Sequence, residues 1–136
     1  MKAIEHINPD GMYKSPAFSQ AVVTQGDGKT IYIGGQNGID ANGKMAGTDI
    51  ATQTTQAMKN IETLLQACGA GWDHVVRFTI IMKQGEDLMA GFKASQAFTG
   101  KAAQQAAVTA MVVAGLAHPE AVVEIDAIAY IGDAKG

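Results

Sequence analysis

The chain has 136 residues, 47% of them hydrophobic, and its 10 basic and 13 acidic side chains give a net charge of −3. This size predicts one domain over residues 1–136 with a buried core, and the negative charge disfavours nucleic acid as a partner. No apolar run reaches the roughly 20 residues that span a bilayer, one cysteine cannot form an internal disulfide, and the histidines lack ligand spacing, so we expect a cytoplasmic protein without membrane segment, metal or cofactor.

Turn signals dominate the first third of the chain. The stretch QAVVTQGDGKTIYIGG, residues 20–35, predicts two strands joined in a hairpin around Asp27 and Gly28, because a glycine supplies the positive φ of a tight turn. A second turn is predicted at Asn42 and Gly43. The first eleven residues break at residues 8–11, in an Asn-Pro-Asp-Gly turn, before any apolar segment forms, which predicts no signal peptide.

A helix is predicted over residues 49–70, where the hydrophobic period changes to three or four. Glycines at positions 69 and 71 end it. The apolar stripe consists of Ile50, Ala57, Ile61, Leu64, Leu65 and Cys68. The polar residues between them, expected outside the core, are Gln53, Gln56, Lys59, Asn60 and Glu62.

The second half alternates strand, helix, strand and strand. Strands are predicted at 74–83, 106–115 and 122–132, and a shorter helix at 86–98. In the strand at 74–83, we expect Val75 on the face opposite Phe78. Strands separated by helices need crossover connections, so the prediction is an α+β fold with a mixed sheet and both helices on one face.

The segment AAVTAMVVAGL, residues 106–116, has no charged side chain, and Thr109 is its one polar residue. Both faces of this strand are therefore nearly apolar, yet two helices on one side of the sheet bury only one face. Self-association through the open face would bury the other. The alternative is an interior strand covered by a loop.

Four segments carry a resemblance to a known family: FSQAVV, KTIYIGGQNGID, the long segment of residues 53–83 and VVEIDAIAY. In this order they resemble the Rid family, the reactive-intermediate deaminases, also called YjgF-like or L-PSP endoribonuclease-like proteins. The resemblance runs from about residue 9 to residue 131. It implies a chorismate-mutase-like fold with a six-stranded mixed sheet, a homotrimer with the open sheet faces packed around its centre, and small-molecule pockets at the subunit clefts.

The same resemblance places the ligand pocket and shows where this chain departs from the deaminating branch. The arginine that binds the substrate carboxylate there corresponds to Val108, which cannot do so. The family's tyrosine corresponds to Phe18, the serine of its SGQ motif to Gly34, and an asparagine on the second helix falls near Phe92. Of the usual polar set, the glutamate of the last strand remains, as Glu124.

Glu124 is therefore the candidate catalytic residue, with the alternative that it is only a hydrogen-bonded acid at a subunit cleft. Backbone groups near Gly35 and Gln36 are candidate ligand contacts, or simply part of a turn. Two functions stay open: hydrolysis of a small imine, enamine or related electrophile that is not a standard 2-imino acid, and a non-catalytic ligand-binding or structural trimer. Ribonuclease or translation inhibition is disfavoured, because no basic or aromatic cluster supports it.

Overall fold

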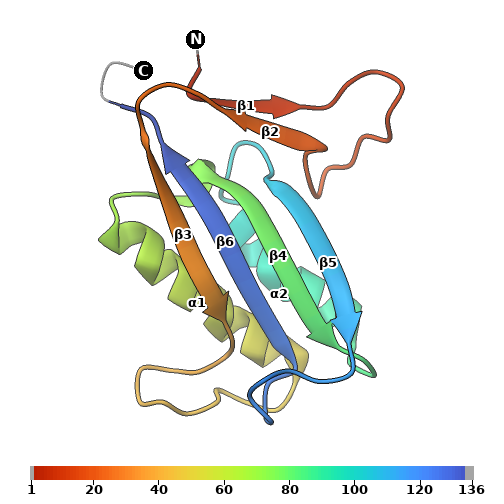
Figure 1. The fold of residues 1–136 in the computed structure, drawn as a ribbon. Coiled ribbons are helices and arrows are strands. Elements are labelled where there is room, and N and C mark those ends of the chain that lie inside the picture. Colours follow the sequence, from red (N-terminus) through yellow and green to blue (C-terminus); the bar gives the residue numbers. More distant parts are fainter. Residues whose placement is uncertain (1, 134–136) are drawn as a thin grey trace.

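The computed structural model describes residues 2–133. Figure 1 shows the order of its elements along the chain. They are β1 (Ile4–Ile7), β2 (Ala21–Thr24), β3 (Lys29–Gln36), α1 (Ile50–Ala67), the short 3-10 helix η1 (Trp72–His74), β4 (Val75–Lys83), α2 (Leu88–Thr99), β5 (Ala107–Val113) and β6 (Val123–Ile131).

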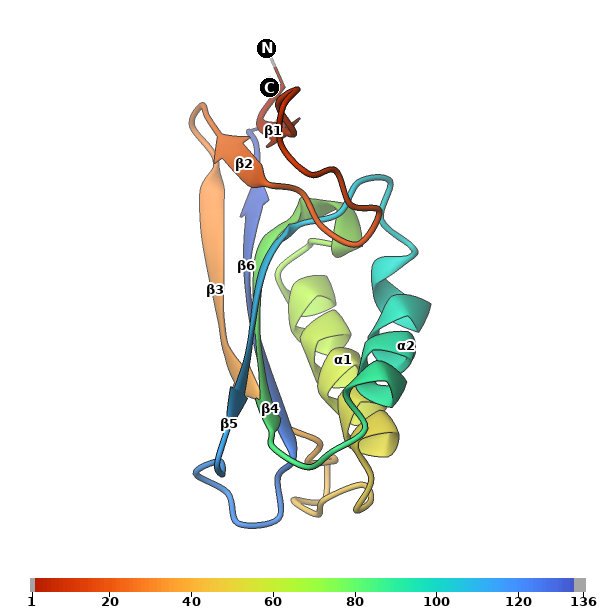
Figure 2. The ribbon, with the colours of Figure 1, turned by 90° about the vertical axis from the view of Figure 1, so that its right-hand side faces the viewer.

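A four-stranded sheet in the order β3-β6-β4-β5 forms the centre of the fold. β4 and β5 are parallel because α2 carries the chain back between them, whereas β6 runs antiparallel to both β3 and β4. Both helices lie on the same side of this sheet, as Figure 2 shows. The predicted α+β class, mixed sheet and one-sided helix layer are thus confirmed.

The six strands do not form one sheet, and the predicted hairpin is wrong. β2 pairs with β1, an unpredicted four-residue strand, as a separate antiparallel pair. β3 instead pairs with β6 over most of its length. The glycine with a positive φ before β3 is Gly26. Gly28 is needed for a different reason, because a Cβ there would collide with the Tyr130 ring and the Ile131 carbonyl oxygen.

The first helix begins where predicted but buries a partly different face. The Asp49 carboxylate caps it by accepting a hydrogen bond from the Thr52 backbone N–H. Gln53, expected outside the core, is fully buried, because its amide donates to the Gly47 and Glu120 carbonyls and accepts from the Val122 N–H. Leu64, expected in the stripe, is 38% exposed.

The core lies between the sheet and the helices. A bulge between Val75 and Arg77 interrupts the alternation of β4, so Val75 is buried on the same side as Phe78 rather than opposite to it. Trp72 packs beside the Phe78 and Phe98 rings, at centroid distances of 6.3 and 5.9 Å. Within residues 2–133, no helix is both long and apolar enough to cross a membrane.

Candidate functional site

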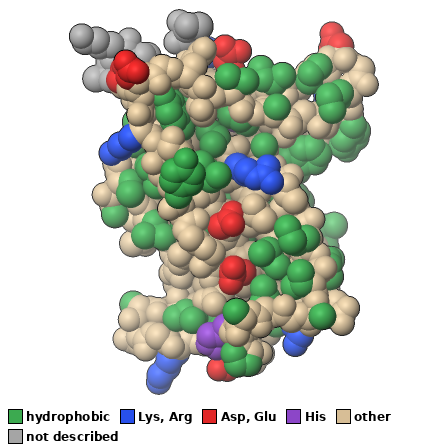
Figure 3. Space-filling view, in the orientation of Figure 1, with side chains coloured by type: hydrophobic (Ala, Val, Ile, Leu, Met, Phe, Trp, Pro, Cys, Tyr) green, Lys and Arg blue, Asp and Glu red, His purple; other side chains and the backbone are tan. Residues whose placement is uncertain are grey.

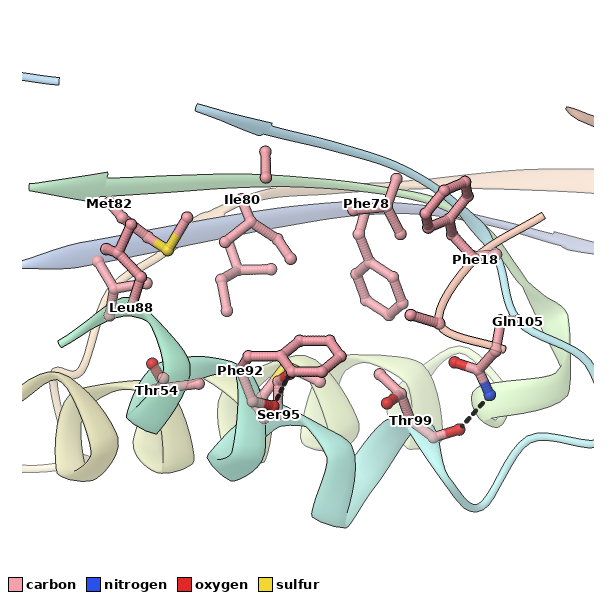
Figure 4. Close-up of a pocket in the computed structure, with 18 of the residues that line it drawn as sticks. Phe18, Thr54, Phe78, Ile80, Met82, Leu88, Phe92, Ser95, Thr99 and Gln105 are labelled. Carbon is pink, nitrogen blue, oxygen red and sulfur yellow. Dashed lines mark hydrogen bonds between the residues drawn. The ribbon is translucent and has the colours of Figure 1, made fainter. Parts of the chain in front are cut away.

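A cavity of about 380 Å³ lies between α2 and the helix-facing side of the sheet. Figure 4 shows β4 and β5 above it and α2 below, with Phe18 and Gln105 near one end and Leu88 near the other. Its volume falls within the roughly 300–1,000 Å³ of typical ligand pockets. Leu88, Met89 and Phe92 of α2 and Val112 of β5 are more than a third exposed, so this edge of the helix layer presents an apolar surface.

The cavity brings together three of the predicted ligand-binding residues. Phe18, Phe92 and Val108 all line it, although they come from the loop before β2, from α2 and from β5. The Ser19 backbone N–H donates to the Ala106 carbonyl at 3.0 Å and its hydroxyl to the Gln105 carbonyl at 2.6 Å, which holds Phe18 against the start of β5. Val108 therefore lines the same cavity as Phe18 and Phe92.

The walls of the cavity are apolar and carry no charge among the described lining residues. The uncharged polar residues among them are Thr54, Ser95, Thr99 and Gln105. The Ser95 hydroxyl donates within its own helix, to the Phe92 carbonyl at 2.7 Å. A ligand carboxylate placed beside Val108 would thus have no cation to pair with, and burial of an unpaired charge costs binding free energy.

Gln105 is the polar group that the sequence did not suggest. Its Nε2 donates to the Thr99 carbonyl at 3.0 Å, which orients the amide and leaves Oε1 as a hydrogen-bond acceptor. In Figure 4 this oxygen points toward the interior of the cavity. No motif marks a glutamine in the loop before a strand, so only the three-dimensional arrangement identifies it.

The predicted catalytic residue, Glu124, lies on the opposite face of the sheet. Along β6, Val123, Ile125 and Ala127 are buried toward the helices, so Glu124 and Asp126 lie half-buried on the outer face. Figure 3 views this face and shows two acidic patches in its middle with hydrophobic side chains on either side. Within residues 2–133, neither carboxylate makes a hydrogen bond or ion pair.

The predicted glycine segment lies beside Glu124. A Cβ on Gly35 would overlap the Glu124 carboxylate, whereas one on Gly34 would meet open space. The Gln36 amide turns back and donates to the Gly34 carbonyl at 3.2 Å. The structure therefore places Gly35 beside Glu124, separated by the sheet from Phe18 and Val108. Gln36 is not part of this group, because it pairs with Ile125, whose side chain faces the helices.

Arg77 and Lys101, two cations of the chain, have partners outside the cavity. Arg77 donates to the Thr109 hydroxyl at 2.7 Å on the outer face. Lys101 pairs with Glu62 at 3.2 Å and lies over the Phe98 ring. The Trp72 indole donates to Glu62 at 2.6 Å, and this hydrogen bond, with Lys101 adding to it, holds the pKa of the Glu62 carboxyl below its ordinary value.

The protein is thus a two-layer α+β domain with an apolar pocket under α2 and a carboxylate on the open face of its sheet. Comparison with known proteins then identifies the family. The sequence matches the family described as Endoribonuclease L-PSP over residues 11–131. The chain therefore belongs to this family, the Rid family that its sequence resembles.

Individual relatives agree with this assignment. A Rid-family protein of unknown function from Yersinia pestis, YyfB, is 33% identical, with a TM-score of 0.85 over 96% of this chain and 100% of that one. A RutC family protein of Pyrococcus horikoshii is 28% identical over 83% of this chain and 86% of its own length. The 2-iminobutanoate/2-iminopropanoate deaminase of Rattus norvegicus is 35% identical over 52% of this chain. The chain spans 50% of that deaminase's length.

Proposed function

We propose that three copies of this chain form a trimer whose subunit clefts bind a small uncharged imine, enamine or related electrophile, and that Glu124 activates the water that hydrolyses it. The observation that carries this proposal is the division of the predicted site between two faces of one sheet. Within one chain the sheet separates Glu124 and Gly35 from the cavity lined by Phe18 and Val108. A second copy that covers the cavity mouth with its outer face would bring the two halves together.

Glu124 suits the role of a general base. It is half-buried and makes no hydrogen bond or ion pair within residues 2–133, so its carboxylate is available to orient water. Gly35 leaves the space that the carboxylate occupies. Removal of a general base typically costs about a hundred- to ten-thousandfold in rate.

The lining of the cavity supports the proposed substrate class. The deaminases among the relatives act, by name, on 2-imino acids, which carry a carboxylate. Here Val108 and its apolar neighbours offer that group no partner. A desolvated charge-assisted pair contributes about 1.5–3 kcal/mol, and a carboxylate left unpaired against an apolar wall adds a further desolvation cost. Together these should lower kcat/KM for a 2-imino acid by at least about a hundredfold.

Two assays test the proposal. Acetophenone imine, which is neutral, should be hydrolysed faster with the wild-type protein than without it, and Glu124→Gln should remove at least about 99% of that acceleration. 2-Iminopropanoate, generated in situ from serine by a dehydratase and followed as its semicarbazone, should be hydrolysed at least about a hundredfold more slowly than by the rat deaminase. Wild-type activity within about tenfold of that enzyme would contradict the placement of the pocket.

A second test of the proposed function restores the family's polar groups. Val108→Arg should raise 2-iminopropanoate hydrolysis only partly, because Phe18 and Gly34 also lack the family's hydroxyl groups. Adding Phe18→Tyr and Gly34→Ser should raise it further, and a Cβ at position 34 meets open space. If the triple variant is no better than the single one, the three positions do not belong to one site.

The second candidate function is a trimer that binds its ligand without catalysis. The apolar character of the cavity favours it, because Glu124 is the one ionisable side chain among the predicted site residues. An unchanged rate of acetophenone imine hydrolysis in Glu124→Gln would support this alternative. Ribonuclease activity is not proposed, because a net charge of −3 disfavours binding to phosphates.

A further inference from the structure

The volume of the cavity and the orientation of Gln105 indicate what kind of ligand the cavity binds. This inference rests on the proposed function, because it takes the same cavity as the binding site. An apolar cavity of about 150 Å³ binds benzene. The cavity here measures about 380 Å³, so it accommodates a group with on the order of ten non-hydrogen atoms. This is larger than the three- or four-carbon 2-imino acids named for the mammalian relatives.

The interior supplies apolar contacts along its length. Met58 and Ile125 form part of its wall and are about 1% exposed. Met82 and Leu88 lie at the end distant from Gln105, and Phe92 and Phe78 between the two ends (Figure 4). Three methionines and three phenylalanine rings among the lining residues form a deformable surface that suits an aromatic ring or a branched aliphatic group.

The polar group at the other end selects the ligand's functional group. One hydrogen of Gln105 Nε2 is donated to the Thr99 carbonyl, and this bond orients the amide so that Oε1, an acceptor, points into the cavity (Figure 4). An acceptor binds an N–H or O–H group and repels a carboxylate. We propose that the cavity binds an uncharged aromatic or bulky aliphatic molecule whose N–H or O–H group donates to Gln105 Oε1, as a neutral aryl imine or enamine would.

Indole and indene provide matched probes, because they share size and shape but only indole carries an N–H. By isothermal titration, wild-type protein should bind indole about fivefold more tightly than indene, the ratio expected of one hydrogen bond. Indole-3-carboxylate should bind at least tenfold more weakly than indole, because its charge would be buried unpaired. Equal binding of indole and indene, or tighter binding of the carboxylate, would overturn the proposal.

Two variants locate the binding. Ser95→Met should fill part of the cavity and weaken both probes at least tenfold. Thr63→Met, which also replaces a hydroxyl bonded within its own helix but lies exposed on α1 outside the cavity, should bind them like wild type. Gln105→Met should remove the preference for indole and keep indene binding. If Ser95→Met binds indole as well as Thr63→Met does, the probe lies elsewhere and the proposal is wrong; far-ultraviolet circular dichroism and urea unfolding confirm that each variant is folded.

Failure of this inference is distinguishable from failure of the proposed function. Indole binding with the expected variant pattern, but no imine hydrolysis, would overturn the enzymatic role and support the ligand class. Glu124-dependent hydrolysis of acetophenone imine without indole binding would support the enzymatic role and overturn the ligand class.

Discussion

Thr54 is a buried polar residue whose hydroxyl lacks a hydrogen-bond partner within residues 2–133. It is 2% exposed and lies where α1 meets Gly91 of α2. A buried hydroxyl without a partner costs about 1–3 kcal/mol, and Val has nearly the same shape and helix propensity. We therefore expect Thr54→Val to raise the free energy of unfolding by about 1 kcal/mol, measured by urea denaturation.

Thr55 is the matched control for this prediction. It is the next residue of the same helix, and its hydroxyl donates to the Ala51 carbonyl at 2.9 Å. Thr55→Val loses a hydrogen bond that exists, so it should leave stability unchanged or lower it. A larger loss of stability in Thr54→Val than in Thr55→Val would contradict the assignment of an unpartnered hydroxyl.

Glu62 links stability to pH through its hydrogen bond from the Trp72 indole. Because the pKa of this carboxyl is lowered in the folded protein, ionised Glu62 stabilises the fold above the unfolded-state pKa of about 4.3. The stabilisation is lost as the pH falls through the lower folded-state pKa. Glu62→Gln should therefore be less stable than wild type at pH 7, and the difference should shrink at pH 3.

Urea midpoints of wild type and Glu62→Gln at the two pH values test this linkage. A deficit of equal size at pH 7 and pH 3 would show that the ionised carboxylate is not its cause. Lys101→Met should reproduce only a small part of the effect at pH 7, because Lys101 is more than half exposed and its ion pair is screened by solvent.

At the scale of elements, Gly28 allows the start of β3 to pack closely against the end of β6. A Cβ at this position would collide with the Tyr130 ring and the Ile131 carbonyl oxygen, and Tyr130 is fixed by donating to the Gly26 carbonyl at 2.7 Å. Gly28→Ala should thus lower the free energy of unfolding by about 1–3 kcal/mol.

Gly34, within β3, is the control. A Cβ there meets open space, so Gly34→Ala should change stability by less than about 0.5 kcal/mol. Thermal and urea unfolding of the two variants provide the comparison. Equal stability of Gly28→Ala and Gly34→Ala would contradict the account of the β3 and β6 contact.

The elements that the sequence predicted best are those with long, regular hydrophobic periods. Helix α1, with its Asp49 cap, and strands β4, β5 and β6 lie within one to three residues of the predicted bounds. β1 was missed because four residues carry too little pattern, and the pairing of β2 with β1 instead of β3 depends on contacts distant in sequence. A bulge at Val75 is likewise invisible to a period of two.

Part of the candidate site could likewise be predicted from the sequence, and part could not. The family resemblance led to Phe18, Phe92 and Val108, and all three line one cavity. It could not reveal the cavity's volume or the free acceptor of Gln105, because both depend on how α2 sits over the sheet. The burial of Gln53 was missed for a related reason: its three backbone partners come from segments outside its helix.

At the scale of the whole molecule, the open face of the sheet is the dominant feature (Figure 3). Tyr32 and Met111 on this face are 79% and 41% exposed in the single chain, beside the half-buried Ile81 and Ile128. Apolar surface of this kind is unfavourable in water. Its burial against other copies is the proposed reason that residues 106–113 lack a polar face.

A charge on this face should separate the copies. Met111→Glu is tolerated by a single chain because the side chain is partly exposed, but it would bury a carboxylate among apolar groups in the trimer. The variant should sediment as a folded monomer at concentrations where wild type is trimeric. Met12→Glu, at a position 51% exposed and outside the sheet, should remain trimeric, and dissociation of both variants alike would contradict the assignment of the interface.

Sedimentation equilibrium of the wild-type protein at micromolar concentration tests the central claim most directly, because both the covered sheet face and the completed cleft require other copies of the chain. The account predicts a single species of three times the 14.1 kDa chain mass. A stable, soluble species of 14.1 kDa would contradict it, since Glu124 and the cavity would then stay on opposite faces of one sheet.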